Sequence, residues 1–157
     1  MTKIENYLVR LVATGLYSGY SPLVPGTVGT IPAWLIGFFL IRGNTLALIA
    51  VCIVCFFVSV WASGKAEISL GHDCRKIVID EWAGMFLTFL FVPYSLTNYV
   101  IAFVAFRAFD VIKAPPAGQL EKLPGGWGVT MDDVVAGVQA NIVTQVVIYL
   151  LARLNGA

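Results

Sequence analysis

The sequence predicts an all-α membrane protein, a polytopic helical bundle with four or five membrane helices. Two features of the composition favour this class. Of the 157 residues, 59% are apolar and only 12% are charged, which gives a mean hydropathy of +0.85. Water-soluble domains carry roughly twice that share of charge, about 25%. So few charged residues cannot cover a soluble surface, and the length fits one membrane-embedded domain over residues 1–157.

Five apolar segments are candidates for these helices. A spanning helix needs about 20 mainly apolar residues. Residues 44–63 meet that length without a charge, and residues 132–151 meet it once their two leading carboxylates lie at the membrane boundary. Residues 79–91 and 97–112 are shorter or charged at one end, so they cross only if that end reaches water or lines an enclosed cavity. Residues 28–41 are shorter still and form either the fifth crossing or a re-entrant, tilted element.

The first fifteen residues predict an amphipathic helix. Glu5 and Arg10 interrupt them, and no long apolar stretch of the kind found in a cleavable signal peptide is present. The apolar residues spaced to share one helical face are Ile4, Tyr7, Leu8, Leu11 and Val12. Such a helix either lies in the membrane interface or packs against the bundle as an ordinary helix.

The basic residues predict the orientation of the chain. With five crossings, eight Lys and Arg residues fall on one side of the membrane, and only Arg42 and Arg153 fall on the other. An excess of basic residues marks the cytoplasmic side. All nine carboxylates fall on the same side as the eight basic residues. One membrane face, predicted to be cytoplasmic, therefore carries all the acidic side chains.

The polar run GKAEISLGHDCRKIVIDE, residues 64–81, ends inside an apolar segment. Its last residues, Asp80 and Glu81, point about 100° apart on a helix and cannot both face lipid at low cost. A functional site explains them, and so does an acidic pair at a helix start. His72, the only histidine, is a candidate for proton transfer or metal binding, with a surface role as the alternative.

The stretch RAFDVIKAPPAGQLEKLPGGWGVTMDD, residues 107–133, concentrates charge between two apolar segments, and we interpret it as the rim of an active site. Arg107, Asp110 and Lys113 follow one another at spacings of three, so one helix edge alternates positive, negative and positive. A simple ladder of salt bridges would have the same pattern. The chemistry of these residues therefore depends on what the edge faces.

The start of the last helix holds two further acids. Thr130 stands three residues before Asp133, as in a capping box that begins a helix. A cap of this kind explains Asp133 as a structural residue. It leaves Asp132 unexplained.

A run of small residues, YSGYSPLVPGTVGT at positions 17–30, leads into an apolar helix. Gly26, Thr27, Gly29 and Thr30 can present backbone N–H groups at the helix start, where the free donors and the helix dipole suit a phosphate. The run is not a P-loop, because no Gly-Lys-Ser/Thr follows. The alternative is an ordinary helix start built from Pro and Thr.

These motifs resemble, in the same order and over almost the whole chain, the phosphatidylglycerophosphatase A family of bacterial membrane phosphatases. The matching motifs are YSPLVPGTVGT, HDC followed by IVIDEWAG, FRAFDVIKAPP and PGGWGVTMDDVVAG. Where the family usually has Lys-Pro, this chain has Lys113-Ala114, a difference in the loop and not in the charged residues. The resemblance implies hydrolysis of phosphatidylglycerophosphate to phosphatidylglycerol and phosphate, with Mg²⁺, by a multi-pass protein of the bacterial inner membrane whose active site faces the cytoplasm.

The residues themselves support a consistent chemistry. Carboxylates gathered at a membrane surface would repel a phosphomonoester unless a cation intervened, and oxygen ligands suit Mg²⁺. The expected metal ligands, one of which acts as base or nucleophile, are Asp80, Glu81, Asp110, Asp132 and Asp133, with Glu67 as a further ligand. The expected phosphate-binding residues are Arg107, Lys113, Thr27 and Thr30.

Two other functions remain open at this stage. A small membrane cation transporter or channel would place acids at helix ends along an ion path, but it requires polar residues through the bilayer, and these segments are nearly free of them. A lipid phosphotransferase would carry a D-G-x2-A-R motif, which is missing from the sequence. The expected partners are the lipid substrate and membrane lipid, with no nucleic acid.

Overall fold

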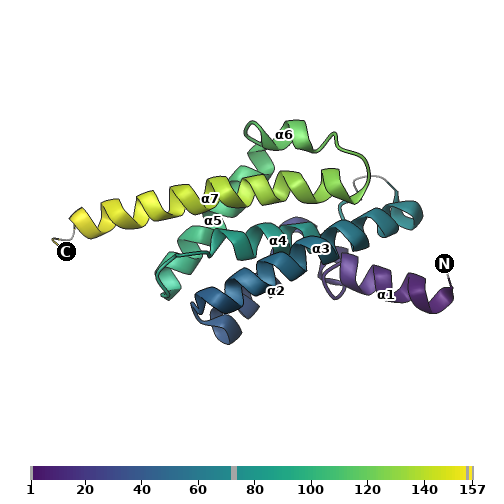
Figure 1. The fold of residues 1–157 in the computed structure, drawn as a ribbon, viewed down its shortest axis with the longest axis horizontal. Helices are drawn as coiled ribbons and strands as arrows, with labels where there is room; N and C mark the ends of the chain where they lie inside the picture. Colours follow the sequence, from purple (N-terminus) through teal and green to yellow (C-terminus); the bar gives the residue numbers. More distant parts are fainter. Residues whose placement is uncertain (1, 72–73, 155, 157) are drawn as a thin grey trace.

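The computed structural model describes residues 2–71, 74–154 and 156, and this part of the chain is helical without a strand. Its elements in order are α1 (Lys3–Ala13), η1 (Ser18–Tyr20), α2 (Pro25–Leu35), the π-helical continuation η2 (Ile36–Ile41), α3 (Thr45–Leu70), α4 (Ile79–Thr88), α5 (Leu96–Ile112), α6 (Ala117–Leu120) and α7 (Gly126–Leu154). All five apolar segments predicted from sequence are helices (Figure 1). The all-α prediction is confirmed.

Two helices are long and apolar enough to cross a membrane. They are α3, with 26 residues, and α7, with 29. The ten residues of α4 rise about 15 Å, roughly half of a hydrocarbon core about 30 Å thick. Four or five crossings therefore stay a prediction, while two candidate spans are present.

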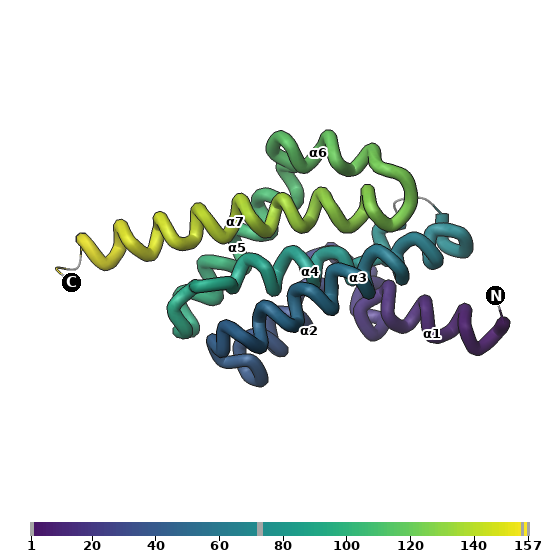
Figure 2. Tube along the Cα trace, viewed as in Figure 1, coloured from purple at the N-terminus to yellow at the C-terminus, as the bar shows by residue number. Residues whose placement is uncertain are grey.

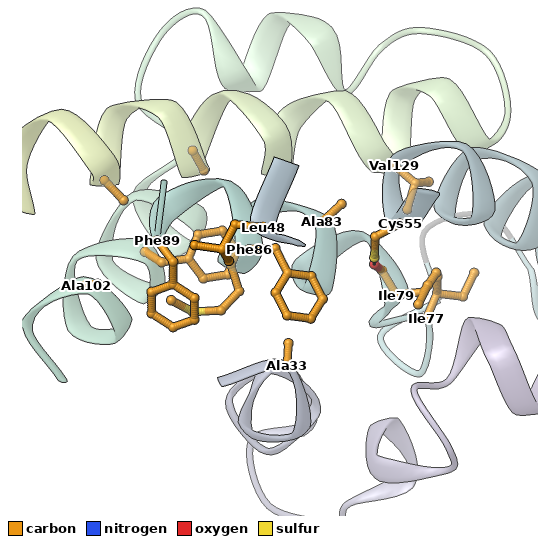
Figure 3. Close-up of a cluster of buried hydrophobic side chains, with 14 of the residues drawn as sticks. Ala33, Leu48, Cys55, Ile77, Ile79, Ala83, Phe86, Phe89, Ala102 and Val129 are labelled. Atoms are coloured by element: carbon orange, nitrogen blue, oxygen red, sulfur yellow. The ribbon is translucent and has the colours of Figure 1, made fainter. Parts of the chain in front are cut away.

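The short helix α4 lies at the centre of the bundle, where it packs against α2, α3, α5 and α7. Its buried face carries Phe86 and is continued by Phe89, around which Leu48 and small residues such as Ala33 close the core (Figure 3). Phe89 also stacks on the ring of Tyr99 at 4.1 Å between centroids. Aromatic and small side chains thus alternate across the facing helices, as close packing requires.

Glycines allow α4 and α7 to approach closely. A Cβ atom on Gly137 would lie 2.5 Å from the carbonyl oxygen of Gly84, and a Cβ atom on Gly84 would lie 2.5 Å from that of Asp133. Real Cβ atoms do not come so near to backbone, so neither position accepts a side chain without moving a helix. This contact sets the N-terminal turn of α4 beside the acids of α7.

The N-terminal helix α1 packs on α3 through Val9 and Ala13, which are fully buried. The apolar side chains of Ile4, Tyr7 and Leu8 stay exposed on its outer face. The predicted helix is therefore confirmed, and it packs against the bundle while keeping an apolar face. Its position in the membrane interface stays a prediction.

The last helix begins earlier than the sequence predicts. α7 starts at Gly126, so Thr130 lies inside the helix and is not its N-cap. The Thr130 hydroxyl instead forms a hydrogen bond of 2.7 Å with Ser59 of α3. The glycine at 126 allows this, because a Cβ there would collide with the carbonyl oxygen of Val60. The short helix α6 packs beside the first turns of α7 (Figure 2).

Candidate active site

A cavity of about 470 Å³ lies where α2 and α4 begin and α5 ends, against the first turns of α7. Its charged lining consists of the carboxylates Asp80, Glu81, Asp110, Glu121, Asp132 and Asp133 and the cations Arg75, Arg107 and Lys113. All five acids predicted as catalytic are among them, together with both predicted phosphate-binding cations. Acidic residues therefore outnumber basic ones in this lining, six to three.

Arg107 joins three helices at this cavity. Its Nη1 lies 3.1 Å from Oε2 of Glu81 on α4 and 2.6 Å from Oδ2 of Asp110, one turn further along α5. The same nitrogen donates a hydrogen bond of 3.2 Å to the hydroxyl oxygen of Thr30 on α2. Only 15% of the Arg107 side chain is exposed. Because charge pairs are screened little when buried, this guanidinium holds α2, α4 and α5 together.

Thr30 contacts both members of the ion pair between Arg107 and Glu81. Its hydroxyl donates a hydrogen bond to Oε2 of Glu81 and accepts the one from Arg107, so it fixes both charged groups at once. The residue is fully buried. One turn earlier on α2, a Cβ atom on Gly26 would lie 2.5 Å from Oε1 of Glu81 and 2.7 Å from Nη2 of Arg107. Gly26 therefore leaves the room that this ion pair occupies.

Lys113 is the second cation at the cavity. It follows the last residue of α5, where its backbone adopts the left-handed conformation with a φ of 49°. Its Nζ lies 2.7 Å from Glu121 and 3.0 Å from Oδ2 of Asp132. Partial burial lowers the pKa of Lys113, but these two carboxylates outweigh it and raise the pKa above its ordinary value. Lys113 therefore stays protonated at neutral pH.

Asp80 and Asp133 differ from the other acids. Both are buried, and neither forms an ion pair with any residue in the described part of the chain. Asp80 Oδ1 accepts a hydrogen bond of 3.0 Å from the backbone N–H of Glu81, and Asp132 Oδ1 accepts one from that of Asp133. Removing an ionised carboxylate from water costs several kcal/mol unless a cation compensates it. These two aspartates are therefore the groups that most need a positive ligand.

The donor chemistry of the cavity fits a hard divalent cation, because it offers several carboxylate oxygens and an excess of negative charge. As the side chains stand, however, no three acidic, His or Cys residues of the described ranges are arranged to hold a metal ion. Glu81, Asp110 and Asp132 form ion pairs with Arg107 or Lys113 instead. The residues left to ligate a metal first are Asp80 and Asp133.

The remaining predicted site residues lie elsewhere. Thr27 and Thr30 are on α2 but not among the residues that line the cavity, and Thr30 acts on Glu81 and Arg107 instead of facing a ligand. Glu67 is on α3, which contributes no lining residue. His72 falls outside the described residues, so its predicted role in proton transfer stays a prediction.

Sequence reasoning did not single out Glu121 or Arg75 as site residues, and it considered Gly26 only for its backbone N–H group, although all three line the cavity. Glu121 lies within the charged stretch of residues 107–133, and Arg75 lies in the polar run before α4. The charge of Glu121 and Arg75 within these two runs could have identified them as candidate site residues. The requirement for a glycine at position 26 depends on contacts from α4 and α5, which the local sequence does not contain.

The phosphatidylglycerophosphatase A family model matches residues 11–148 of this chain. The chain belongs to this family of phosphatases. It is 37% identical to phosphatidylglycerophosphatase A of Escherichia coli over 135 residues, covering 82% of this chain and 77% of the relative. The enzyme of the same name from Haemophilus influenzae is 33% identical over 146 residues, covering 90% and 89% of the two chains.

A further relative carries a different substrate in its name. A protein of Bacteroides thetaiotaomicron, provisionally named a phosphatidylinositol-3-phosphatase, is 36% identical over 152 residues, covering 92% of this chain and 96% of the relative. No solved structure matches the chain. The family resemblance seen in the sequence motifs is thus confirmed.

The contacts of Thr30 predict a positioning role. Replacing it with Val removes the hydroxyl and keeps the shape, so Arg107 and Glu81 lose their shared partner. We expect phosphate release from phosphatidylglycerophosphate to fall roughly 10- to 100-fold, as for the loss of a hydrogen bond to a charged group. Thr30→Ser keeps the hydroxyl and should restore most of the rate. Equal activity in wild type and Thr30→Val would show that the contact does not matter for turnover.

Proposed function

We propose that this protein hydrolyses the terminal phosphomonoester of phosphatidylglycerophosphate, with Mg²⁺, at the cytoplasmic face of the bacterial inner membrane. The observation that carries the proposal is the single cavity in which Arg107 and Lys113 face carboxylates from α4, α5 and α7. The names of the relatives from Escherichia coli and Haemophilus influenzae support the substrate. The apolar composition and the two long apolar helices support the membrane location.

The two cations would bind the phosphate group. Arg107 offers a planar set of donors that matches phosphate oxygens, and Lys113 adds a mobile point charge from the end of α5. Both are now paired with carboxylates, so an incoming phosphate dianion competes with Glu81, Asp110 and Asp132 for the same donors. The hydrogen bond from Arg107 to the buried Thr30 hydroxyl would keep the guanidinium oriented during that exchange.

Asp80 and Asp133 are the candidates for the group that starts the reaction. Acting as a base, one carboxylate takes a proton from water while the water oxygen forms a bond to phosphorus and the bond to the lipid oxygen breaks. Acting as a nucleophile, it bonds to phosphorus while the bond to the lipid oxygen breaks, and in a second step water attacks phosphorus and releases the carboxylate and phosphate. In either case the leaving lipid alkoxide receives a proton. Mg²⁺, when bound, would supply positive charge beside the phosphate oxygens and favour ionisation of water.

A second substrate is suggested by the relative from Bacteroides thetaiotaomicron, whose name refers to a phosphatidylinositol 3-phosphatase. Both lipids carry a phosphomonoester on a hydroxylated headgroup, and the residues above would bind either phosphate. Release of phosphate from the two lipids, compared at equal surface concentration, distinguishes them. We expect phosphatidylglycerophosphate to have the higher kcat/KM. A clear preference for phosphatidylinositol 3-phosphate would overturn the substrate proposed here.

Asp80→Asn and Asp133→Asn test the acids directly. Each change keeps the size of the side chain and removes the negative charge, so the reaction loses its base or nucleophile and a metal ligand. We expect phosphate release to fall to background, roughly 10³-fold or more, while both variants remain in the membrane fraction. Glu5→Gln is the control, because Glu5 pairs with Lys65 and neither residue lines the cavity. A variant that keeps its activity removes that aspartate from the site.

Metal removal tests the cofactor. In detergent, purified protein treated with a chelator should release almost no phosphate, because acidic residues then outnumber cations in the cavity and oppose the substrate. Adding Mg²⁺ should restore the rate, and adding Na⁺ at the same ionic strength should not. Unchanged activity after exhaustive chelation would exclude a required divalent cation while leaving the phosphatase assignment intact.

A further inference from the structure

An apolar groove of about 200 Å³ runs between α2 and α5, lined by Ile31, Trp34, Val100 and Phe103. All four side chains are apolar. Ile31 and Val100 are exposed, at 40% and 46% of their surface, so the groove is open along its length. Its floor is fixed by a hydrogen bond of 2.8 Å from the Trp34 indole N–H to the carbonyl oxygen of Tyr99. The groove therefore exists before anything binds in it.

The groove continues the candidate active site along the same two helices. On α5, Val100, Phe103 and Arg107 are spaced by three and four residues, so they share one helical face. Going from Arg107 to Val100 covers roughly 10 Å along the helix. On α2, Gly26 lines the cavity and Trp34 lines the groove, two turns further on. If a molecule binds at Arg107 with its charged end, its apolar part can therefore extend along α2 and α5 into this groove.

Two other apolar grooves are less suitable. One, of about 370 Å³, is lined largely by α3 together with Trp82 and Phe86, and the other, of about 220 Å³, by α3 together with Ala83, Leu87 and Val134. α3 contributes no residue to the charged cavity. Of these three grooves, only the α2–α5 groove is formed by two helices that both also line the charged cavity.

We propose that the α2–α5 groove holds an acyl chain of the lipid phosphomonoester whose phosphate binds at Arg107 and Lys113. The inference rests on the proposed function and adds to it the path of the lipid tail. An acyl chain suits the groove because its lining is apolar and open on one side. The charged cavity would bind the terminal phosphate of such a lipid, and the groove would hold its apolar tail. The length of the acyl chain should then affect binding of the lipid through its contacts with α2 and α5, and not through contacts with α3.

Val100→Trp tests the groove, because the larger side chain fills it from a position that is already partly exposed. Val146→Trp on α7 is the matched control, with 51% exposure and no place in any of these cavities. For dioleoyl phosphatidylglycerophosphate we expect Val100→Trp to lower kcat/KM about tenfold or more, since burial of two methylene groups accounts for that much affinity. For the dibutanoyl lipid the rate should not change. Val146→Trp should behave as wild type with both.

Equal kcat/KM for Val100→Trp and Val146→Trp on the long-chain lipid would overturn the groove. So would a loss of the same size on the short-chain lipid, because that would place the effect at the headgroup. If wild type releases phosphate from neither lipid, the proposed function fails. Labelling then tests separately whether the groove holds an acyl chain. A melting curve in detergent confirms that each variant folds.

Labelling of the wild-type protein uses phosphatidic acid that carries a diazirine midway along one acyl chain. Illumination should attach the probe to peptides from α2 and α5, and more strongly than phosphatidylcholine with the same chain. Labels confined to α3, or equal labelling by the two lipids, would show that the groove takes ordinary membrane lipid or nothing. This readout depends on neither turnover nor any variant.

Discussion

The guanidinium of Arg107 is the contact on which the arrangement of the site depends. It lies between Glu81 and Asp110 and reaches Thr30, so one buried cation fixes the ends of three helices. Breaking a buried ion pair by removing one partner typically costs about 3–5 kcal/mol, because the other charge is left without compensation. The glycine at position 26 follows from the same constraint, since any side chain there would take the space of the pair.

A second constraint brings the remaining acids into range. α4 and α7 approach through Gly84 and Gly137, and this contact places Asp80 at the start of α4 near Asp132 and Asp133. Three separate segments thus supply one cavity with more negative than positive charge. Such an excess is costly in a protein interior and is expected where a cation or a reaction requires it. The fold therefore concentrates acidic side chains in the cavity that we propose as the active site.

Much of this could be predicted from the sequence, because the signals were local. Uncharged apolar runs indicated α3 and α7, and acids in unusual apolar surroundings indicated Asp80, Glu81, Asp132 and Asp133. What could not be predicted depends on partners from other helices. PGGWG resembles a loop, yet α7 begins at its second glycine, Gly126, which lets the helix pack closely against Val60. Thr30 resembled a phosphate ligand, and only the contacts to Glu81 and Arg107 show that it positions them.

The central claim is that carboxylates from α4, α5 and α7 form one site for a divalent cation beside a phosphate. Electron paramagnetic resonance with Mn²⁺ in place of Mg²⁺ tests this most directly. Detergent-solubilised wild type should bind Mn²⁺, release it to excess Mg²⁺, and show coupling to the phosphorus nucleus when inorganic phosphate is added. A protein that binds no Mn²⁺, or that binds it equally well when Asp80 and Asp133 are both Asn, would contradict the account.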